Sequence, residues 1–272
     1  MDDHPPSGFD NPDMPPNVAI RTAEVYDIPL RTMYSKNVKN LFMAGRNISA
    51  SHVAFTSARV MATCAVIGQA VGTAAAQCVE RGIVPRELAS TPQQLTRLRQ
   101  TLIRDDQTIK GVAGHDPDDR ARTAKVSASS EIGAAKAALI QDGFLRDIPD
   151  AKGNPMEVHH WAGETPGWIQ LDWDRPQRIR EVQITFDSGF PRELILSAQD
   201  SAVINTVRAP QPETVRDYSV TANGKVVAKV EKNHQRVNRL RFEAVEAKSI
   251  RVAIAATNGL EQARVFEIRC YS

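Results

Sequence analysis

The stretch "NLFMAGRNISASHVAFTSARVMATCAVIGQAVGTAAA", residues 40–76, decides the first half of the fold. Residues 40–44 form a short apolar run that ends at Gly45, which predicts a strand buried on both faces. After a polar loop, a long run rich in alanine and glycine predicts a helix over residues 57–81, stopped by Gly82. A strand, a glycine turn and a helix are typical of the closing part of a nucleotide-binding sheet.

The predicted helix carries a face of small residues that includes Ala65, Gly68 and Gly72. Each glycine costs about 1 kcal/mol relative to alanine inside a helix, so a compensating contact is expected. That contact is either tight packing of the helix on a sheet or the approach of a flat cofactor ring. At the turn, Gly45 permits close backbone approach and Arg46 offers a positive charge. The residues alone leave both alternatives open.

Residues 60–79 contain no charged side chain and have the length of a bilayer span. The run is rich in alanine and glycine and is interrupted by Thr63, Gln69, Thr73 and Gln77, with few of the leucine, isoleucine and phenylalanine residues that favour insertion. A buried helix of a soluble protein is therefore predicted, with no membrane span.

Charge and cysteine content exclude some classes of function. The 34 basic and 32 acidic residues are interspersed, so the sequence has no electrostatic footprint for nucleic acid. Three cysteines give no disulfide framework, and no clustered Cys/His spacing predicts a metal site. The N-terminus shows no signal-peptide pattern, and the compartment stays open.

The rest of the chain divides by its hydrophobic period. Residues 90–106 predict a second helix, a linker is expected over residues 106–121, and from about Arg120 the period changes from 3.6 to 2. Short alternating runs follow, with Asn223-Gly224 as a two-residue hairpin signal. These runs predict an all-β jelly-roll sandwich. The expected domains are residues 1–105 and residues 122–272.

Within the closing run "ARVFEIRCY", alternation predicts that Phe266, Ile268 and Cys270 face the core and that Glu267 and Arg269 face water. In "GWIQLDW", Trp168 and Trp173 are assigned to the core or its rim.

The first half resembles the C-terminal segment of FAD-dependent oxidoreductases with a glutathione-reductase-like FAD fold. The matching pattern is "IP-R", "NL-AGR-IS--H" and "RVM-TC---GQA-GTAA", and the resemblance covers about residues 1–90. It implies an incomplete α/β FAD-binding segment made of a strand, a long helix and a helical tail. It also implies that the residues nearest the flavin are Gly45, Arg46, Arg59, Met61, Ala62, Thr63 and Gly68.

One large part of the family pattern is missing, because the sequence contains no GxGxxG. The family's first strand, its phosphate-binding loop and its ribose-binding acidic residue are expected upstream. The chain is therefore expected to be the C-terminal portion of a longer enzyme, completed in cis or in trans and inactive alone. The resemblance implies oxidation of an alcohol or sugar-like substrate. The alternatives are a carbohydrate-binding module with an inactive flavin-domain remnant, and a β-domain that binds nothing.

Three side chains are catalytic candidates. His52 lies between the glycine turn and the helix, where it could take a proton from a substrate hydroxyl. His4 in "DDHPP" is a second candidate base, and Arg59 could hold a substrate oxygen or neutralise a reduced flavin. The structural alternatives are a backbone-bonded loop histidine, a solvated histidine and a helix-start ion pair.

The second half resembles discoidin-like, galactose-binding-like domains of the coagulation-factor type C class. The resemblance rests on Asp142-Gly143, Trp161, "GWIQLDW" and the closing "SIRVAIAATNGLEQARVFEIRCY". It implies glycan binding through loops at one end of the sandwich and a structural calcium ion beside Asp142. His159, His160 and Trp161 are the candidate sugar contacts, with core closure as the alternative for Trp161. Adjacent histidines point apart on a strand, which argues against a metal pair.

Overall fold

The computed structural model describes residues 2–3, 13, 18–19, 25–152, 154–189, 192, 203–204 and 206–272. The chain divides into two compact units. The helical unit comprises Met1–Val112 with Pro149–Asn154, and the β unit comprises Ala113–Ile148 with Pro155–Ser272. The domain bounds expected from the sequence, 1–105 and 122–272, stay a prediction.

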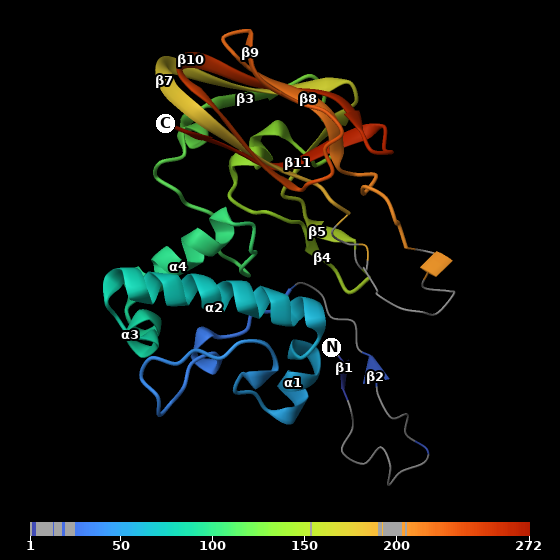
Figure 1. Ribbon diagram of the computed structural model, residues 1–272. Helices are drawn as coiled ribbons and strands as arrows, with labels where there is room; N and C mark the ends of the chain where they lie inside the picture. The colour runs from blue at the N-terminus through green and yellow to red at the C-terminus, as the bar shows by residue number, and fades with distance from the viewer. Residues whose placement is uncertain are drawn as a thin grey trace. The chain divides into compact units, whose positions relative to one another are not determined.

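Among the described residues of the helical unit there are four α-helices, which Figure 1 labels α1 to α4. Its elements are β1 (Asp2–Asp3) paired with β2 (Val18–Ala19), the 3-10 turns η1 (Leu30–Thr32) and η2 (Gly45–Asn47), and the helices α1 (His52–Ala58), α2 (Met61–Arg81), α3 (Pro85–Ser90) and α4 (Pro92–Arg104). Gly82 ends α2 in the left-handed conformation, with φ of 64°. Proline opens both α3 and α4, where its missing N–H has no cost.

Helix α2 packs one side of its surface into two small cores. Its buried residues are Ile67, Ala70, Ala74, Gln77 and Cys78. Ala70, Ala74 and Cys78 pack with Leu88 of α3 and with Leu98 and Leu102 of α4, whereas Ile67 packs in the second core with Met33, Ile48 and Ala58. The Gln77 side chain also donates to the Gln94 carbonyl of α4, at 2.9 Å. In the part of the chain that the structure describes, α2 is the one helix whose length and apolar composition would suffice to cross a membrane, which by itself is weak evidence for a span.

Two sequence predictions about this unit are wrong in detail. Residues 40–44 form no strand, since only Phe42 makes a single bridge, to Tyr34. Leu41 and Met43 are exposed, although residues 33–35 lie alongside: the Ser35 N–H donates to the Leu41 carbonyl at 3.0 Å, and the Met43 N–H donates to the Met33 carbonyl at 2.7 Å. The predicted single helix over residues 57–81 is two helices, because Val60 takes an extended conformation, with ψ of 150°, that ends α1 and starts α2.

The β unit is built on a seven-stranded antiparallel sheet. Its strands are β3 (Lys125–Ala128), β6 (Trp161–Glu164), β7 (Gly167–Phe186), β8 (Val215–Ala222), β9 (Lys225–Val230), β10 (Val237–Thr257) and β11 (Gln262–Tyr271). The 3-10 turn η3 (Arg120–Thr123) precedes β3, and η4 (Ala137–Gln141) follows it. The order is β6-β11-β7-β10-β8-β9, with β3 on β7. A separate pair, β4 (Ile148–Pro149) and β5 (Pro155–Glu157), forms a small hairpin.

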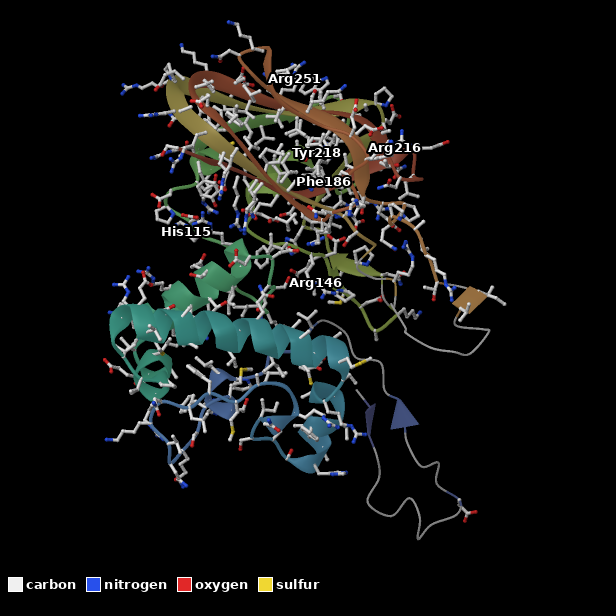
Figure 2. The ribbon with its side chains drawn as sticks, viewed as in Figure 1. His115, Arg146, Phe186, Arg216, Tyr218 and Arg251 are labelled. Carbon is white, nitrogen blue, oxygen red and sulfur yellow. The ribbon has the colours of Figure 1, made fainter. Side chains whose placement is uncertain are left out.

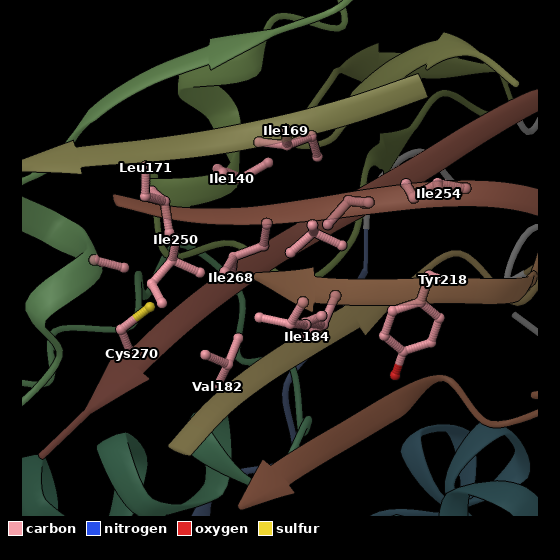
Figure 3. Packing of buried hydrophobic residues seen from close by; sticks show 14 of the residues in the cluster. Ile140, Ile169, Leu171, Val182, Ile184, Tyr218, Ile250, Ile254, Ile268 and Cys270 are labelled. Atoms are coloured by element: carbon pink, nitrogen blue, oxygen red, sulfur yellow. The ribbon is translucent and has the colours of Figure 1, made fainter. Parts of the chain in front are cut away.

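The long strands β7 and β10 fold this sheet into two layers (Figure 1). The first layer holds β3, the start of β7, the end of β10, β8 and β9; the second holds β6, β11, the end of β7 and the start of β10. Their register shifts between Ala247 and Ser249, where the strands pass from one layer to the other. Isoleucine, valine and leucine side chains from both layers fill the core (Figure 3). The predicted β-sandwich is confirmed.

The Asn223-Gly224 hairpin is confirmed at the turn between β8 and β9. Both residues have positive φ, 48° and 80°, as a two-residue turn of the mirror-image type requires. Ala222 and Lys225 pair across it.

The alternation predicted for β11 is confirmed for Ile268 and Cys270 on its core face. It is wrong for Phe266, because the register shifts between Val265 and Glu267: Val265 joins the core, and Phe266, also buried, lies against His160 and Arg236. It is also wrong on the other face. Ile268 and Cys270 are buried as expected, but Glu267 and Arg269 are also buried, at 4% and 3% exposure. They are charged partners, with Arg269 Nη2 2.6 Å from Glu267 Oε2. The segment before β3 lies close to this strand, since the Asp119 side chain accepts from the Cys270 N–H at 2.8 Å. Sequence alternation does not reveal such a covering segment.

Candidate functional site

The first candidate site is the segment from the glycine turn to the start of α2. Gly45 has φ of 71° and nothing within 4 Å of the position a Cβ would occupy. It opens η2, and Arg46 beside it is exposed. The turn therefore leaves its backbone accessible and puts one cation next to it.

His52 and Arg59 lie at the two ends of α1. His52 is the first residue of the helix, not a loop residue as predicted, and is exposed. Ser51 caps this end, since its hydroxyl accepts from the Ala54 N–H at 3.4 Å. Arg59 is the C-cap and keeps helical backbone angles. Seven residues make about two turns, so His52 and Arg59 lie on one side of α1, about 10 Å apart along its axis.

The N-terminus of α2 follows directly and has no side-chain cap. Met61 and Ala62 in its first turn are exposed, and Thr63 is half-buried. The first N–H groups of a helix have no partner within it and carry partial positive charge. This end of α2 can therefore receive an oxygen atom or a negatively charged ring edge.

The glycines of α2 are not used for close packing by any residue that the structure describes. A Cβ at Gly68 or at Gly72 would have nothing within 4 Å. The small-residue face of α2 therefore does not pack tightly on a sheet formed by the described residues. The other alternative, the approach of a cofactor ring, stays a prediction.

These residues fit one end of an FAD site. The exposed glycine turn, the uncapped start of α2 and the open backbone at Gly68 suit the flavin ring. The described residues offer no glycine-rich loop that could cradle the phosphates, in agreement with the sequence. His4 lies outside the described residues.

The second candidate site, in the β unit, brings the two predicted histidines against carboxylates. His159 Nδ1 lies 2.8 Å from Asp142 Oδ2, and His160 Nδ1 lies 2.9 Å from Asp147 Oδ1. The Phe144 ring stacks on His159, with centroids 4.3 Å apart. Burial raises the pKa of Asp142, partly opposed by hydrogen bonds from the Phe144 N–H and His159. Burial acts in the same way on Asp147, but hydrogen bonds from His160 and the His159 N–H outweigh it, so the pKa of Asp147 is lowered.

None of the three predicted sugar contacts presents an open ring face. Trp161 is 0% exposed, and its indole N–H donates to the Ser130 carbonyl at 2.9 Å. Core closure is therefore the alternative that fits Trp161. His160 is buried, and the His159 side chain is 12% exposed. Both histidines brace the loops around Asp142 and Asp147 instead of lining an open platform.

The Asp142-Gly143 loop does not fit a calcium ion. Calcium takes six to eight oxygen ligands. Asp142 Oδ1 already accepts from the Phe144 N–H at 2.8 Å, and Oδ2 is bound to His159. Among the described residues no group of three or more His, Cys, Asp or Glu side chains could hold a metal ion. Gly143, with φ of 86°, instead lets the chain pass the Gly114 backbone, which a Cβ would meet at 2.5 Å.

A third feature, a groove of about 1090 Å³ on the outer face of the first layer, was missed by the sequence reasoning. A cross-strand row crosses it, running from Trp168 through Ala253 and Ser219 to Lys229. The signal was present in "GWIQLDW": Ile169, Leu171 and Trp173 are buried, so Trp168 must point the other way.

Groups of both charges surround this row. Arg216 pairs with Asp217 at 2.7 Å, and Lys229 pairs with Glu231 at 2.6 Å. In Figure 2, Arg216 and Arg251 lie on the outside of the sheet, whereas Tyr218 and Phe186 lie inside. The groove thus combines a floor of small residues, one aromatic wall and fixed charges, which is the usual make-up of a small-molecule site.

Comparisons with known proteins bear on both halves. Over its C-terminal part the chain is similar to a chitosan-binding module of a chitosanase/glucanase from Paenibacillus sp. IK-5, at 16% identity over 58% of this chain and 100% of the module, with a TM-score of 0.41. It is also similar to the family 32 carbohydrate-binding module of NanJ from C. perfringens, solved with galactose, at 17% identity over 56% of this chain and 96% of that module, with a TM-score of 0.38.

A pectin-binding carbohydrate-binding module is similar at 20% identity over 54% of this chain and 89% of that module, with a TM-score of 0.35. No curated protein matches the chain. The sequence model of one family matches the first half, over residues 1–102. Residues 1–102, which hold the glycine turn, α1 and α2, therefore match the FAD dependent oxidoreductase family, as the resemblance predicted.

Proposed function

We propose that this chain is the C-terminal portion of an FAD-dependent oxidoreductase that oxidises an alcohol or a sugar-like substrate. The observation that carries the proposal is the uncapped, exposed start of α2, which follows Arg59 directly, with His52 at the other end of α1, within the residues that match the family. FAD, when bound, supplies the acceptor for a hydride. A helix N-terminus favours negative charge, so the start of α2 would stabilise the reduced ring.

The chain's own residues would handle the proton and the substrate oxygen. As the C–H bond of the substrate gives up its hydride, the imidazole of His52 takes the hydroxyl proton, so the alcohol becomes a carbonyl. Arg59 holds the substrate oxygen or the reduced ring, and Arg46 adds positive charge at the glycine turn. Gly45, Met61, Ala62, Thr63 and Gly68 offer their backbone to the ring.

A second polypeptide part is required by this proposal, because the described residues contain no phosphate cradle. It would supply the glycine-rich loop, either upstream in the same polypeptide or as a partner chain. We take residues 1–105 as the flavin-domain portion and residues 122–272 as the accessory β-sandwich, joined by residues 106–121.

The test is co-expression of the chain with the segment encoded immediately upstream of Met1. Co-purification of the visible flavin absorption band with the complete protein supports the proposal. In that complete enzyme, His52→Ala should abolish turnover and leave flavin bound, whereas His234→Ala, which changes an exposed histidine of the β unit, should do neither. A closed upstream reading frame with no neighbouring gene for the loop would overturn the proposal.

A second function, carbohydrate binding with an inactive flavin-domain remnant, is favoured by the groove at Trp168. Tryptophan offers a flat apolar face, and the serine and charged groups around it offer hydrogen bonds. Binding of the full chain to a glycan array, together with no flavin under any co-expression, would select this second function over the first.

A further inference from the structure

We infer that the groove on the outer face of the first layer binds an anionic oligosaccharide, through carboxylate or sulfate groups that pair with Arg251 and Lys232. The inference rests on the second function proposed above and places the ligand away from His159, His160 and Trp161. It is independent of flavin.

Arg251 is held rigidly beside the groove. Its guanidinium lies over the Trp168 ring, with Cζ 4.2 Å from the centroid. Its Nε donates to Gln170 Oε1 at 2.7 Å, and Gln170 Nε2 in turn donates to both carboxylate oxygens of Asp172 at 2.9 Å. Arg251 and Gln170 are register partners on β10 and β7. Stacking and this hydrogen bond together fix the guanidinium plane.

The two terminal amino groups of Arg251 are left to bind a ligand. Within the described ranges of the chain, no hydrogen-bond or ion-pair partner of these groups is found. A planar guanidinium presents two parallel N–H donors, which match the two oxygens of a carboxylate or of a sulfate. Because the rotamer is already fixed, little conformational entropy is lost on binding.

Lys232 provides the second positive charge. Its backbone N–H donates to Asp217 Oδ1 at 2.9 Å, and its side chain is exposed. Arg216, Lys229, Asp217 and Glu231 neutralise one another in pairs. Of the described charged groups at the groove, the guanidinium of Arg251 and the ammonium of Lys232 are in no ion pair with a carboxylate, so the groove attracts anions.

The spacing of these cations suits an extended ligand. Arg251 pairs with Thr221 on β8, and Lys232 binds Asp217 four residues earlier on the same strand. Four residues of strand span about 13 Å. The floor between them carries the small side chains of Ser219 and Ala253, so a chain of sugar rings can lie across the strands. A single small anion would leave one of the two cations unused.

The test is calorimetric titration of the full chain with three probes: trigalacturonate, a sulfated heparin-derived tetrasaccharide and neutral maltotriose. Binding of either anionic probe, at least tenfold tighter than maltotriose and weakened by added salt, is expected. Which of the two binds tighter identifies carboxylate or sulfate as the recognised group.

Variants locate the site. Arg251→Met should reduce the affinity for the anionic probe about tenfold or more, and Arg251→Lys, which keeps the charge but not the fork, should have an intermediate effect. Lys232→Met, at an exposed side chain, should reduce it about threefold without affecting folding. The matched control is Arg241→Met, an exposed arginine paired with Glu181 in the second layer, which should bind like the unmodified chain.

Three results would overturn the inference. The first is the absence of binding to both anionic probes. The second is equal affinity for the neutral probe, which leaves carbohydrate binding in place but removes the charge recognition. The third is an unchanged affinity of Lys232→Met for the anionic probe, together with an equal loss of affinity in the folded Arg251→Met and Arg241→Met variants.

Discussion

Asp119 is expected to make the β unit less stable as the pH rises from about 4 to about 7. Its carboxyl group is 7% exposed, and burial raises its pKa from 3.8 to about 6. Hydrogen bonds from the N–H groups of Cys270 and Ala121, and the charge of Arg269, oppose this rise but do not cancel it. Between the two pKa values the folded protein binds a proton that the unfolded chain has released.

The direction and the size of the effect follow from these values. Because the folded state holds more protons in this range, its free energy of unfolding falls with increasing pH. A tenfold change in proton affinity is worth about 1.4 kcal/mol, so a rise from 3.8 to about 6 corresponds to about 3 kcal/mol. The loss begins near the unfolded pKa and is complete above the folded one.

The Asp119→Asn variant isolates this contribution. An asparagine oxygen can still accept from the Ala121 and Cys270 N–H groups, which Asp119 Oδ1 binds at 2.9 and 2.8 Å. At pH 4 the free energy of unfolding of the variant should resemble that of the unmodified chain. By pH 8 it should be about 3 kcal/mol higher than that of the unmodified chain. Glu267, whose pKa is raised to about 7 by burial and also by Asp119, adds to the gain in the same direction.

The assay is urea unfolding followed by tryptophan fluorescence. All three tryptophans, Trp161, Trp168 and Trp173, lie in the β unit, so the signal reports that unit alone. The difference between Asp119→Asn and the unmodified chain should grow with pH. A difference that is the same at pH 4 and pH 8, or that shrinks, would refute the reasoning about burial of this carboxyl group.

Three further predictions concern individual residues. Gly68→Ala should stabilise the helical unit by about 0.5 to 1 kcal/mol, because its Cβ would enter open space in a helix, and should weaken flavin binding in the complete enzyme. Gly72→Ala is the control: its stability in thermal unfolding should rise by a similar amount, and its flavin affinity should be unchanged. An equal loss of flavin affinity in both variants would contradict a specific role for Gly68. Gly143→Ala should destabilise the β unit by more than about 1 kcal/mol in urea unfolding, because φ is 86° and the new Cβ would meet the Gly114 backbone; an unchanged midpoint would show that this loop can relax. Trp161→Ala should lower the free energy of unfolding of the β unit by about 3 to 5 kcal/mol in urea unfolding, since the ring is fully buried. A decrease below about 1 kcal/mol would argue against a role of Trp161 in closing the core.

Much of the β-sandwich was predictable because alternation and turn chemistry are local. The period of two at the end of "ARVFEIRCY" puts Ile268 and Cys270 in the core, and Asn223-Gly224 gives a hairpin; the register shift before Glu267, which takes Phe266 off the core face, has no local signal. The burial of Glu267 and Arg269 was not predictable, because the segment that covers them is far from them in the sequence. For the same reason the contacts of His159 with Asp142 and of His160 with Asp147 could not be read from the sequence.

The order of the elements around Gly45 was predicted, but not their detail. The glycine turn and the long run of small residues indicated a turn followed by a helix, and residues 1–102 match the FAD dependent oxidoreductase family. The predicted strand over residues 40–44 is reduced to a single bridge at Phe42, because its neighbour is only the short segment 33–35, which follows directly on η1. The groove at Trp168 depends on four strands, β7, β10, β8 and β9, meeting in one register, which no single run of sequence displays.

The most direct test of the proposed function is the visible absorption spectrum of the purified chain, alone and with the upstream-encoded part. The chain alone should carry no flavin band, and the complete protein should carry one FAD that is released by denaturation. A complete protein that purifies folded and without flavin, even after incubation with excess FAD, would contradict the assignment of residues 1–105 to the closing half of an FAD site.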